Sequence, residues 1–199
     1  MNNLDKFFRD QKKALTLFMT LFYPGKDEFY EWVDILVKNG MDILEIGIPV
    51  KNPIMDGEVI RKSYEKVLEN DIQEEEIVLA LKTIKNKYPN LPIVIMSYFE
   101  GIEKFNLFDY GEYYDAILCP DRYLAKEREG IKLVQIYHED MDDKTIRKLL
   151  NNNDGFAYVL SGKGSTGSRG SLSSNYEITM RRIRKISSIP IQVGFGIYE

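Results

Sequence analysis

The chain has 199 residues, 44% of them apolar, which is enough for one hydrophobic core, and we expect a single domain over residues 1–199. Its 27 basic and 31 acidic residues nearly balance, which argues against a nucleic-acid partner. No apolar run is long enough to cross a bilayer, and acidic residues near the N-terminus do not fit a signal peptide. We therefore expect a cytoplasmic protein with no membrane partner.

Short apolar runs alternate with helical patterns along the chain. The first strand is predicted at residues 15–20 and the first helix at 28–40, where Gly40 fits the position just beyond a helix end. The further predicted strands are 42–48, 91–98, 114–120, 131–137, 155–161 and 189–196. The further predicted helices are 56–70, 73–89, 101–110, 122–130, 142–153 and 174–188.

Seven mostly apolar strands that alternate with helices are typical of a parallel sheet covered on both faces. We predict an α/β fold, a (β/α)8 TIM barrel of the phosphate-binding type. A complete barrel of this class has eight strands and usually about 250 residues. The seventh predicted strand ends near the last residue, so we expect a barrel that is incomplete at its C-terminus, without the last strand and helix.

Glu45 lies in the second predicted strand, DILEIGI. Side chains alternate between the two faces of a strand, so Glu45 shares a face with Ile43 and Gly47, while Leu44 and Ile46 share the other. The fully apolar face suits contact with helices, which directs Glu45 into the barrel. Burial raises the pKa of a carboxyl group and suits it to acid or base catalysis near neutral pH. The alternative is a structural acid that is paired with a Lys or Arg.

Asp56 follows eleven residues later, beyond a loop with two prolines. Two interpretations remain open from its position. An Asp before a helix is a favoured N-cap, and Asp-Gly is common in turns. A second carboxylate near Glu45 is also suited to share in catalysis.

Two glycine-rich segments follow the last two predicted strands. Residues 158–172, YVLSGKGSTGSRGSL, contain four glycines between a strand and a helix, where backbone N–H groups are able to hold a phosphate; a surface loop is the alternative. Residues 194–196, Gly-Phe-Gly, follow the seventh strand, where barrels of this class frequently bind phosphate.

Four other side chains have weaker claims to a function. Cys119 fits a buried strand end better than a reactive thiol. His138 is the only histidine and titrates in the physiological range, but no neighbouring sequence marks a catalytic partner. Tyr98 and Tyr158 each follow an apolar run and would either line a pocket or pack in the core.

Taken together, these segments resemble the alpha chain family of tryptophan synthase, from about Leu15 to the end. LEIGIPVKNPIMDG is similar to the family's strand-2 signature, in which a Glu is followed eleven positions later by the Asp of an Asp-Gly pair. YVLSGKGSTG is similar to the family's loop 6, and VGFGI is similar to its phosphate-binding turn after strand 7.

The resemblance implies a lyase that cleaves indole-3-glycerol phosphate to indole and glyceraldehyde 3-phosphate by a retro-aldol reaction. It implies no metal and no organic cofactor, and a pyridoxal-phosphate beta chain as partner in an alpha-beta-beta-alpha tetramer. By the same resemblance, Glu45 is the acid and base at indole C3 and the glycerol hydroxyl, and Asp56 holds the indole N–H. The other residues implied to bind substrate are Tyr98, Tyr158, Thr166, Gly167, Gly194, Phe195 and Gly196.

The chain also departs from the family pattern. Val50, Lys51 and Asn52 stand where Phe-Ser-Asp is common, in a loop that contacts the beta chain in the family. Gly162 and Lys163 follow Ser161 where an Arg is usual, and the second phosphate turn after strand 8 is not in the sequence. Two other functions remain open: another phosphate-binding barrel enzyme, and a non-catalytic subunit that binds and activates a beta chain.

Overall fold

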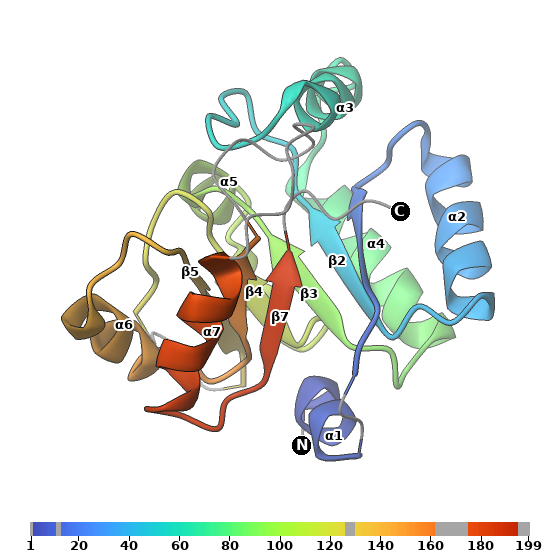
Figure 1. Cartoon of the computed structure of the whole chain (residues 1–199). Coiled ribbons are helices and arrows are strands. Elements are labelled where there is room, and N and C mark those ends of the chain that lie inside the picture. The colour runs from blue at the N-terminus through green and yellow to red at the C-terminus, as the bar shows by residue number, and fades with distance from the viewer. Residues whose placement is uncertain (1, 11–12, 126–129, 162–174, 195–199) are drawn as a thin grey trace.

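The structure, a computed structural model, describes residues 2–10, 13–125, 130–161 and 175–194. Seven parallel strands form one sheet in the order in which they occur in the chain, with helices around its outer face (Figure 1). The strands are β1 (Thr16–Thr20), β2 (Ile43–Gly47), β3 (Ile93–Met96), β4 (Ala116–Leu118), β5 (Lys132–Tyr137), β6 (Ala157–Leu160) and β7 (Ile191–Gly194). The helices are α1 (Asn3–Asp10), α2 (Lys26–Lys38), α3 (Glu58–Leu68), α4 (Glu74–Lys87), α5 (Phe99–Lys104), the 3₁₀ helix η1 (Leu107–Tyr110), α6 (Asp143–Leu150) and α7 (Asn175–Arg184).

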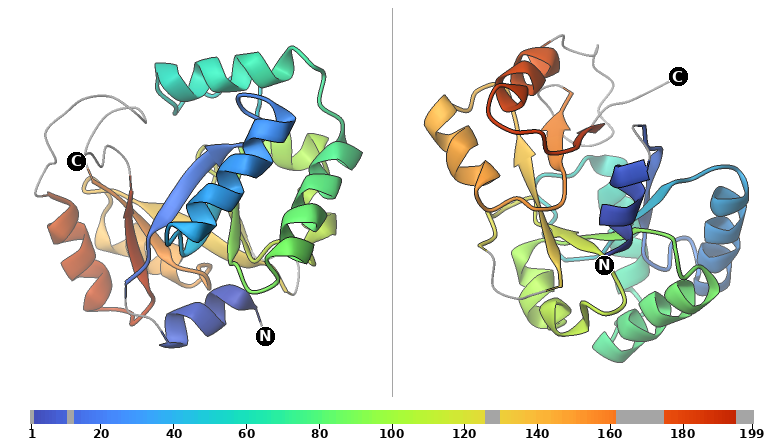
Figure 2. Two further views of the ribbon diagram at one scale, coloured as in Figure 1. Left: turned by 90° about the vertical axis from the view of Figure 1, so that its right-hand side faces the viewer. Right: turned by 90° about the horizontal axis from the view of Figure 1, so that it is seen from below.

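The sheet curls strongly, so that its first and last strands approach each other (Figure 2). The Thr16 hydroxyl on β1 donates to Gln192 Oε1 on β7 at 3.0 Å, although the two residues are 176 positions apart. Among the described strands, β1 pairs only with β2, and β7 pairs only with β6. The prediction of a TIM-barrel fold with about seven strands is confirmed.

The alternation predicted for β2 is also confirmed. Leu44 and Ile46 belong to the large cluster that joins the sheet to the surrounding helices. Ile43 belongs instead to the cluster inside the barrel, which it shares with Val94 and Tyr158. In the strand register, Glu45 lies between Phe18 of β1 and Val94 of β3. The carboxyl group therefore points into the barrel, because register neighbours in a parallel sheet share a face.

Helix α1, which the sequence analysis did not predict, lies at the end of the barrel where the strands begin (Figure 1). Its Leu4 is fully buried in the interior cluster. Asp115, just before β4, accepts hydrogen bonds from the backbone N–H groups of Asn3 and Ile93 and from Lys85 Nζ, at 2.8, 3.0 and 2.9 Å. This carboxylate fixes α1 to the sheet and to α4.

One predicted element is wrong in the part that the structure describes. The helix expected at 122–130 is not formed at residues 122–125, and 126–129 lie outside the described residues. The helix predicted at 101–110 is divided into α5 and the 3₁₀ helix η1. The other predicted helices and strands are present with shifted ends, and Gly40 has the positive φ of +92° expected just beyond a helix. None of the described helices is long and apolar enough to span a membrane.

Candidate active site

The candidate site lies where the strands end, and Glu45 is its most deeply placed acid. Its side chain is buried, and its Oε1 has no hydrogen-bond partner among the described residues. Burial, with a smaller contribution from the negative charge of Asp56, raises the pKa of Glu45 to about 8. A group with this pKa carries its proton at neutral pH and is able both to give and to take one there.

Asp56 is buried beside Tyr98, 42 residues further along the chain. The Tyr98 hydroxyl donates to Asp56 Oδ2 at 2.8 Å and accepts a hydrogen bond from the Met55 backbone N–H at 2.9 Å. The first residue of α3 is Glu58 and its N-cap is Gly57, so Asp56 stands one residue before the cap position. Tertiary contacts thus hold Asp56 near enough to Glu45 to affect its pKa.

Tyr158 on β6 belongs to the cluster inside the barrel. Burial first, and then the charges of Glu45 and Asp56, raise the pKa of its hydroxyl above the ordinary value, which places Tyr158 near both acids. Its ring also lies against Gly194, the last residue of β7. A Cβ atom on residue 194 would be 2.1 Å from the Tyr158 hydroxyl oxygen, so only glycine leaves room for this tyrosine.

Two side chains at the site were not selected from the sequence. A Cβ atom on Gly47, which follows Glu45 on the same face of β2, would be 2.4 Å from the Phe18 ring and 2.8 Å from the Tyr64 hydroxyl oxygen. Tyr64 of α3 belongs to the buried cluster that contains Tyr98, and Phe18 of β1 packs against this cluster. The sequence pattern does not distinguish these two residues, because many other aromatic residues in the chain also lie in apolar strands or amphipathic helices.

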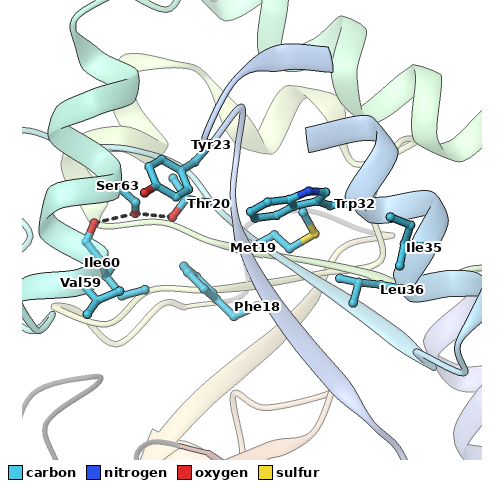
Figure 3. Close-up of a pocket in the computed structure, with 10 residues that line it drawn as sticks. All are labelled: Phe18, Met19, Thr20, Tyr23, Trp32, Ile35, Leu36, Val59, Ile60 and Ser63. Carbon is cyan, nitrogen blue, oxygen red and sulfur yellow. Dashed lines mark hydrogen bonds between the residues drawn. The ribbon is translucent and has the colours of Figure 1, made fainter. Parts of the chain in front are cut away.

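A hydrogen bond between side-chain hydroxyl groups joins α3 to β1. The hydroxyl groups of Thr20 and Ser63 are 2.7 Å apart, and Ser63 also donates to the Ile60 carbonyl oxygen (Figure 3). A mainly apolar groove of about 450 Å³ runs along β1 between α3 and α2. In Figure 3, Phe18 points toward the α3 side of this groove and Met19 toward the α2 side, next to Trp32.

Four of the predicted site residues lie outside the described part of the chain: Thr166, Gly167, Phe195 and Gly196. His138, for which the sequence marked no catalytic partner, is half-buried just beyond β5. Cys119 is buried as predicted, and burial together with Asp121 raises the pKa of its thiol to about 12, which suits a core residue. In the described part of the chain, no group of three or more His, Cys, Asp or Glu residues is placed to bind a metal.

Fold and site together define a class. The molecule is a parallel β/α-barrel protein with an acid of raised pKa inside the barrel and a second carboxylate that accepts a hydrogen bond from a tyrosine, at the end where barrel enzymes act.

Comparison with known proteins defines the family. The model of the tryptophan synthase alpha chain family matches residues 4–116 and 120–199. The tryptophan synthase alpha chains of Geotalea daltonii and Caldanaerobacter subterraneus are 30% and 31% identical to this chain over 212 and 213 residues. The matches cover 100% and 99% of this chain, and 80% and 81% of those proteins.

A solved structure agrees with these matches. The tryptophan synthase a2b2 complex from Pyrococcus furiosus contains a chain with a TM-score of 0.79 and 27% identity to this one, covering 92% of this chain and 79% of that one. The chain belongs to the tryptophan synthase alpha chain family.

Proposed function

We propose that the chain is an indole-3-glycerol phosphate lyase, which releases indole and glyceraldehyde 3-phosphate by a retro-aldol reaction. The observation that carries this proposal is Glu45, a buried acid with an unpartnered oxygen and a pKa of about 8, inside a barrel of this family. A retro-aldol reaction at indole needs one group that gives a proton to carbon and takes a proton from oxygen. A carboxyl group whose pKa lies near neutral pH is suited to both steps.

In the first step, protonated Glu45 gives its proton to indole C3. The electron pair of the C2–C3 double bond forms the new C–H bond, and the ring nitrogen takes on the positive charge. Asp56 accepts a hydrogen bond from the ring N–H and stabilises this charge, while Tyr98 holds its other oxygen at 2.8 Å. A fixed carboxylate costs no reorganisation at the moment when the charge develops.

In the second step, the Glu45 carboxylate removes the proton from the hydroxyl group on the carbon attached to indole C3. The O–H electron pair becomes the aldehyde C=O bond, the C–C bond breaks, and its electron pair restores the aromatic indole. Glu45 recovers its proton, so the cycle is balanced without any other reactant. The ring of Phe18, which lies against Gly47 on the Glu45 face of β2, supplies a surface suited to a flat indole ring.

Phosphate binding is proposed at the end of β7. Gly194 begins the Gly-Phe-Gly segment there, and the contact with Tyr158 leaves no room for a larger residue at this position. Thr166 and Gly167 are proposed to belong to a loop that covers the same end of the barrel. No cofactor enters the proposed reaction.

We also propose a tryptophan synthase beta chain as the partner, supported by the a2b2 complex that contains the Pyrococcus furiosus relative. The loop at residues 50–58 exposes Ile54 and Met55, which supply apolar surface for such a contact. Altered residues in this loop are expected to adjust the affinity rather than the chemistry. Titrating the chain into a beta chain, and following the conversion of serine and indole to tryptophan, measures this contact separately from lyase activity.

The lyase proposal is tested by indole release from indole-3-glycerol phosphate. Glu45→Gln keeps the shape of the side chain but removes the proton transfer, so we expect turnover to fall by roughly 10³-fold. Glu103→Gln, an exposed acid on α5, is the matched control and is expected to keep full turnover. Equal turnover by the Glu45 variant and the control would contradict the proposal, as would an unsubstituted chain that releases no indole.

A further inference from the structure

Tyr64 has an unusual combination of burial and an unused polar group. Its side chain is only 1% exposed, yet no hydrogen bond joins its hydroxyl to any of the described residues. The Tyr64 oxygen is not among the fully enclosed polar atoms without a partner, so it keeps a small accessible surface at which a ligand is able to meet it. Most buried tyrosine hydroxyls instead have a partner within the protein. Tyr114, which is equally buried, follows this rule and donates to the Leu107 carbonyl oxygen at 2.8 Å.

The position of this hydroxyl is known from Gly47. The Tyr64 oxygen is 2.8 Å from the point where a Cβ atom on residue 47 would lie. Glu45 and Gly47 are two residues apart on the same face of β2, so their Cβ positions differ by about 6.6 Å along the strand. The phenol thus lies one strand repeat beyond Glu45, toward the open end of the barrel.

The chemistry of the groups around Tyr64 restricts what it is able to bind. Burial and the charges of Asp56, Tyr98 and Glu45 all raise the pKa of its hydroxyl, which therefore keeps its proton and acts as a donor. An indole ring has an N–H donor but no lone-pair acceptor in its plane, and Asp56 is already assigned to that N–H. The acceptors in the substrate are the oxygen atoms of the glycerol part and the phosphate.

We propose that the Tyr64 hydroxyl donates a hydrogen bond to the substrate oxygen on which Glu45 acts, the hydroxyl of the carbon attached to indole C3. This inference rests on the proposed lyase function. The phenol and the carboxyl group lie on the same face of β2, so one substrate oxygen placed between them is able to form a hydrogen bond with each. The phenol stabilises the negative charge that develops on this oxygen as Glu45 takes its proton.

The test compares two ligands that differ only in their hydroxyl groups. Indole-3-glycerol phosphate and 3-indolylpropyl phosphate share the ring and the phosphate, and the Glu45→Gln variant binds the first with too little turnover to disturb a titration. Adding Tyr64→Phe to this variant is expected to weaken glycerol-ligand binding about tenfold, the size of one lost hydrogen bond, and propyl-ligand binding by less than twofold. Isothermal titration calorimetry measures both. Tyr114→Phe in the same background is the control for loss of a buried hydroxyl and is expected to change neither affinity.

A second measurement uses the chain with Glu45 intact. Tyr64→Phe is expected to lower kcat for indole release by at least tenfold, because the contact strengthens in the transition state. Equal weakening of both ligands, or unchanged binding and kcat, would overturn the role of Tyr64 while leaving the lyase function standing. An unsubstituted chain that neither releases indole nor binds either ligand would overturn both, so the two failures are distinguishable. Retained binding of the propyl ligand by the Tyr64 variant shows that it is folded.

Discussion

Two carboxylates, both only 4% exposed, lie at opposite ends of the barrel and differ in what surrounds them. Asp115, where the strands begin, accepts hydrogen bonds from two backbone N–H groups and from the Lys85 ammonium group. Glu45, near the ends of the strands, has an oxygen without a partner among the described residues and a pKa raised to about 8. Burial is thus the same, but only one of the two acids has its hydrogen bonds satisfied.

The difference separates a structural acid from a candidate catalytic one. A buried carboxylate with a cation and two N–H donors is stabilised in its charged form and holds elements together. A buried acid without such partners is costly to ionise, so it keeps its proton and remains available to a substrate. Removing each acid should therefore have opposite effects on stability.

The largest effect on stability is expected at the structural acid. Asp115→Ala leaves the partly buried Lys85 and the N–H groups of Asn3 and Ile93 without their acceptor, and we expect a loss of about 3–5 kcal/mol in the free energy of unfolding. Urea denaturation measures it. A loss below about 1 kcal/mol would mean that α1 and α4 do not depend on this carboxylate.

The second prediction concerns the pH dependence of stability at Glu45. Its pKa is about 8 in the folded chain and near 4.5 in the unfolded chain, so the folded state holds more protons between these values. Stability should therefore fall as pH rises through this range, by up to about 1.4 kcal/mol per pH unit from this group. Below pH 4.5 the group is protonated in both states and contributes no slope.

Glu45→Gln isolates this contribution, because glutamine does not titrate. Urea denaturation of both chains at pH 5, 6, 7 and 8 is expected to show the variant gaining stability relative to the unsubstituted chain as the pH rises. Parallel curves for the two chains would refute the raised pKa.

A smaller effect is expected from the charge of Asp56. Asp56→Asn removes the carboxylate that is proposed to face the indole N–H, and turnover is expected to fall about 10²-fold. The same change removes one cause of the raised pKa of Glu45, so the alkaline limb of the pH–rate profile should move to lower pH. A limb that stays in place would mean that burial alone sets the pKa.

The smallest effect is expected at Tyr98. Tyr98→Phe removes one hydrogen bond to Asp56 and one from the Met55 N–H, and we expect turnover to fall about tenfold with a loss of about 1 kcal/mol in stability. Kinetics and urea denaturation of the same preparation measure both. A Tyr98 variant as active as the unsubstituted chain would show that Asp56 is held without this hydroxyl.

The sequence predicted those features that depend on local periodicity. A strand repeats every two residues, so the pattern of DILEIGI was enough to place Glu45 inside the barrel, and the alternation of strands and helices was enough to predict a parallel barrel. The sequence prediction does not include α1, although Leu4, Phe7 and Phe8 in NLDKFFRD have the spacing of one helix face.

Only the tertiary structure decided which distant residues meet. Asp56 contacts Tyr98 across 42 positions, Asn3 contacts Asp115 across 112, and Thr16 contacts Gln192 across 176. The loops between strands set these meetings, and a loop has no periodicity from which its path is predictable. The position of the Tyr64 hydroxyl was unpredictable for the same reason. The sequence shows only a tyrosine on a helix, but the fold brings this helix over β2 and places the hydroxyl against Gly47, two residues from Glu45.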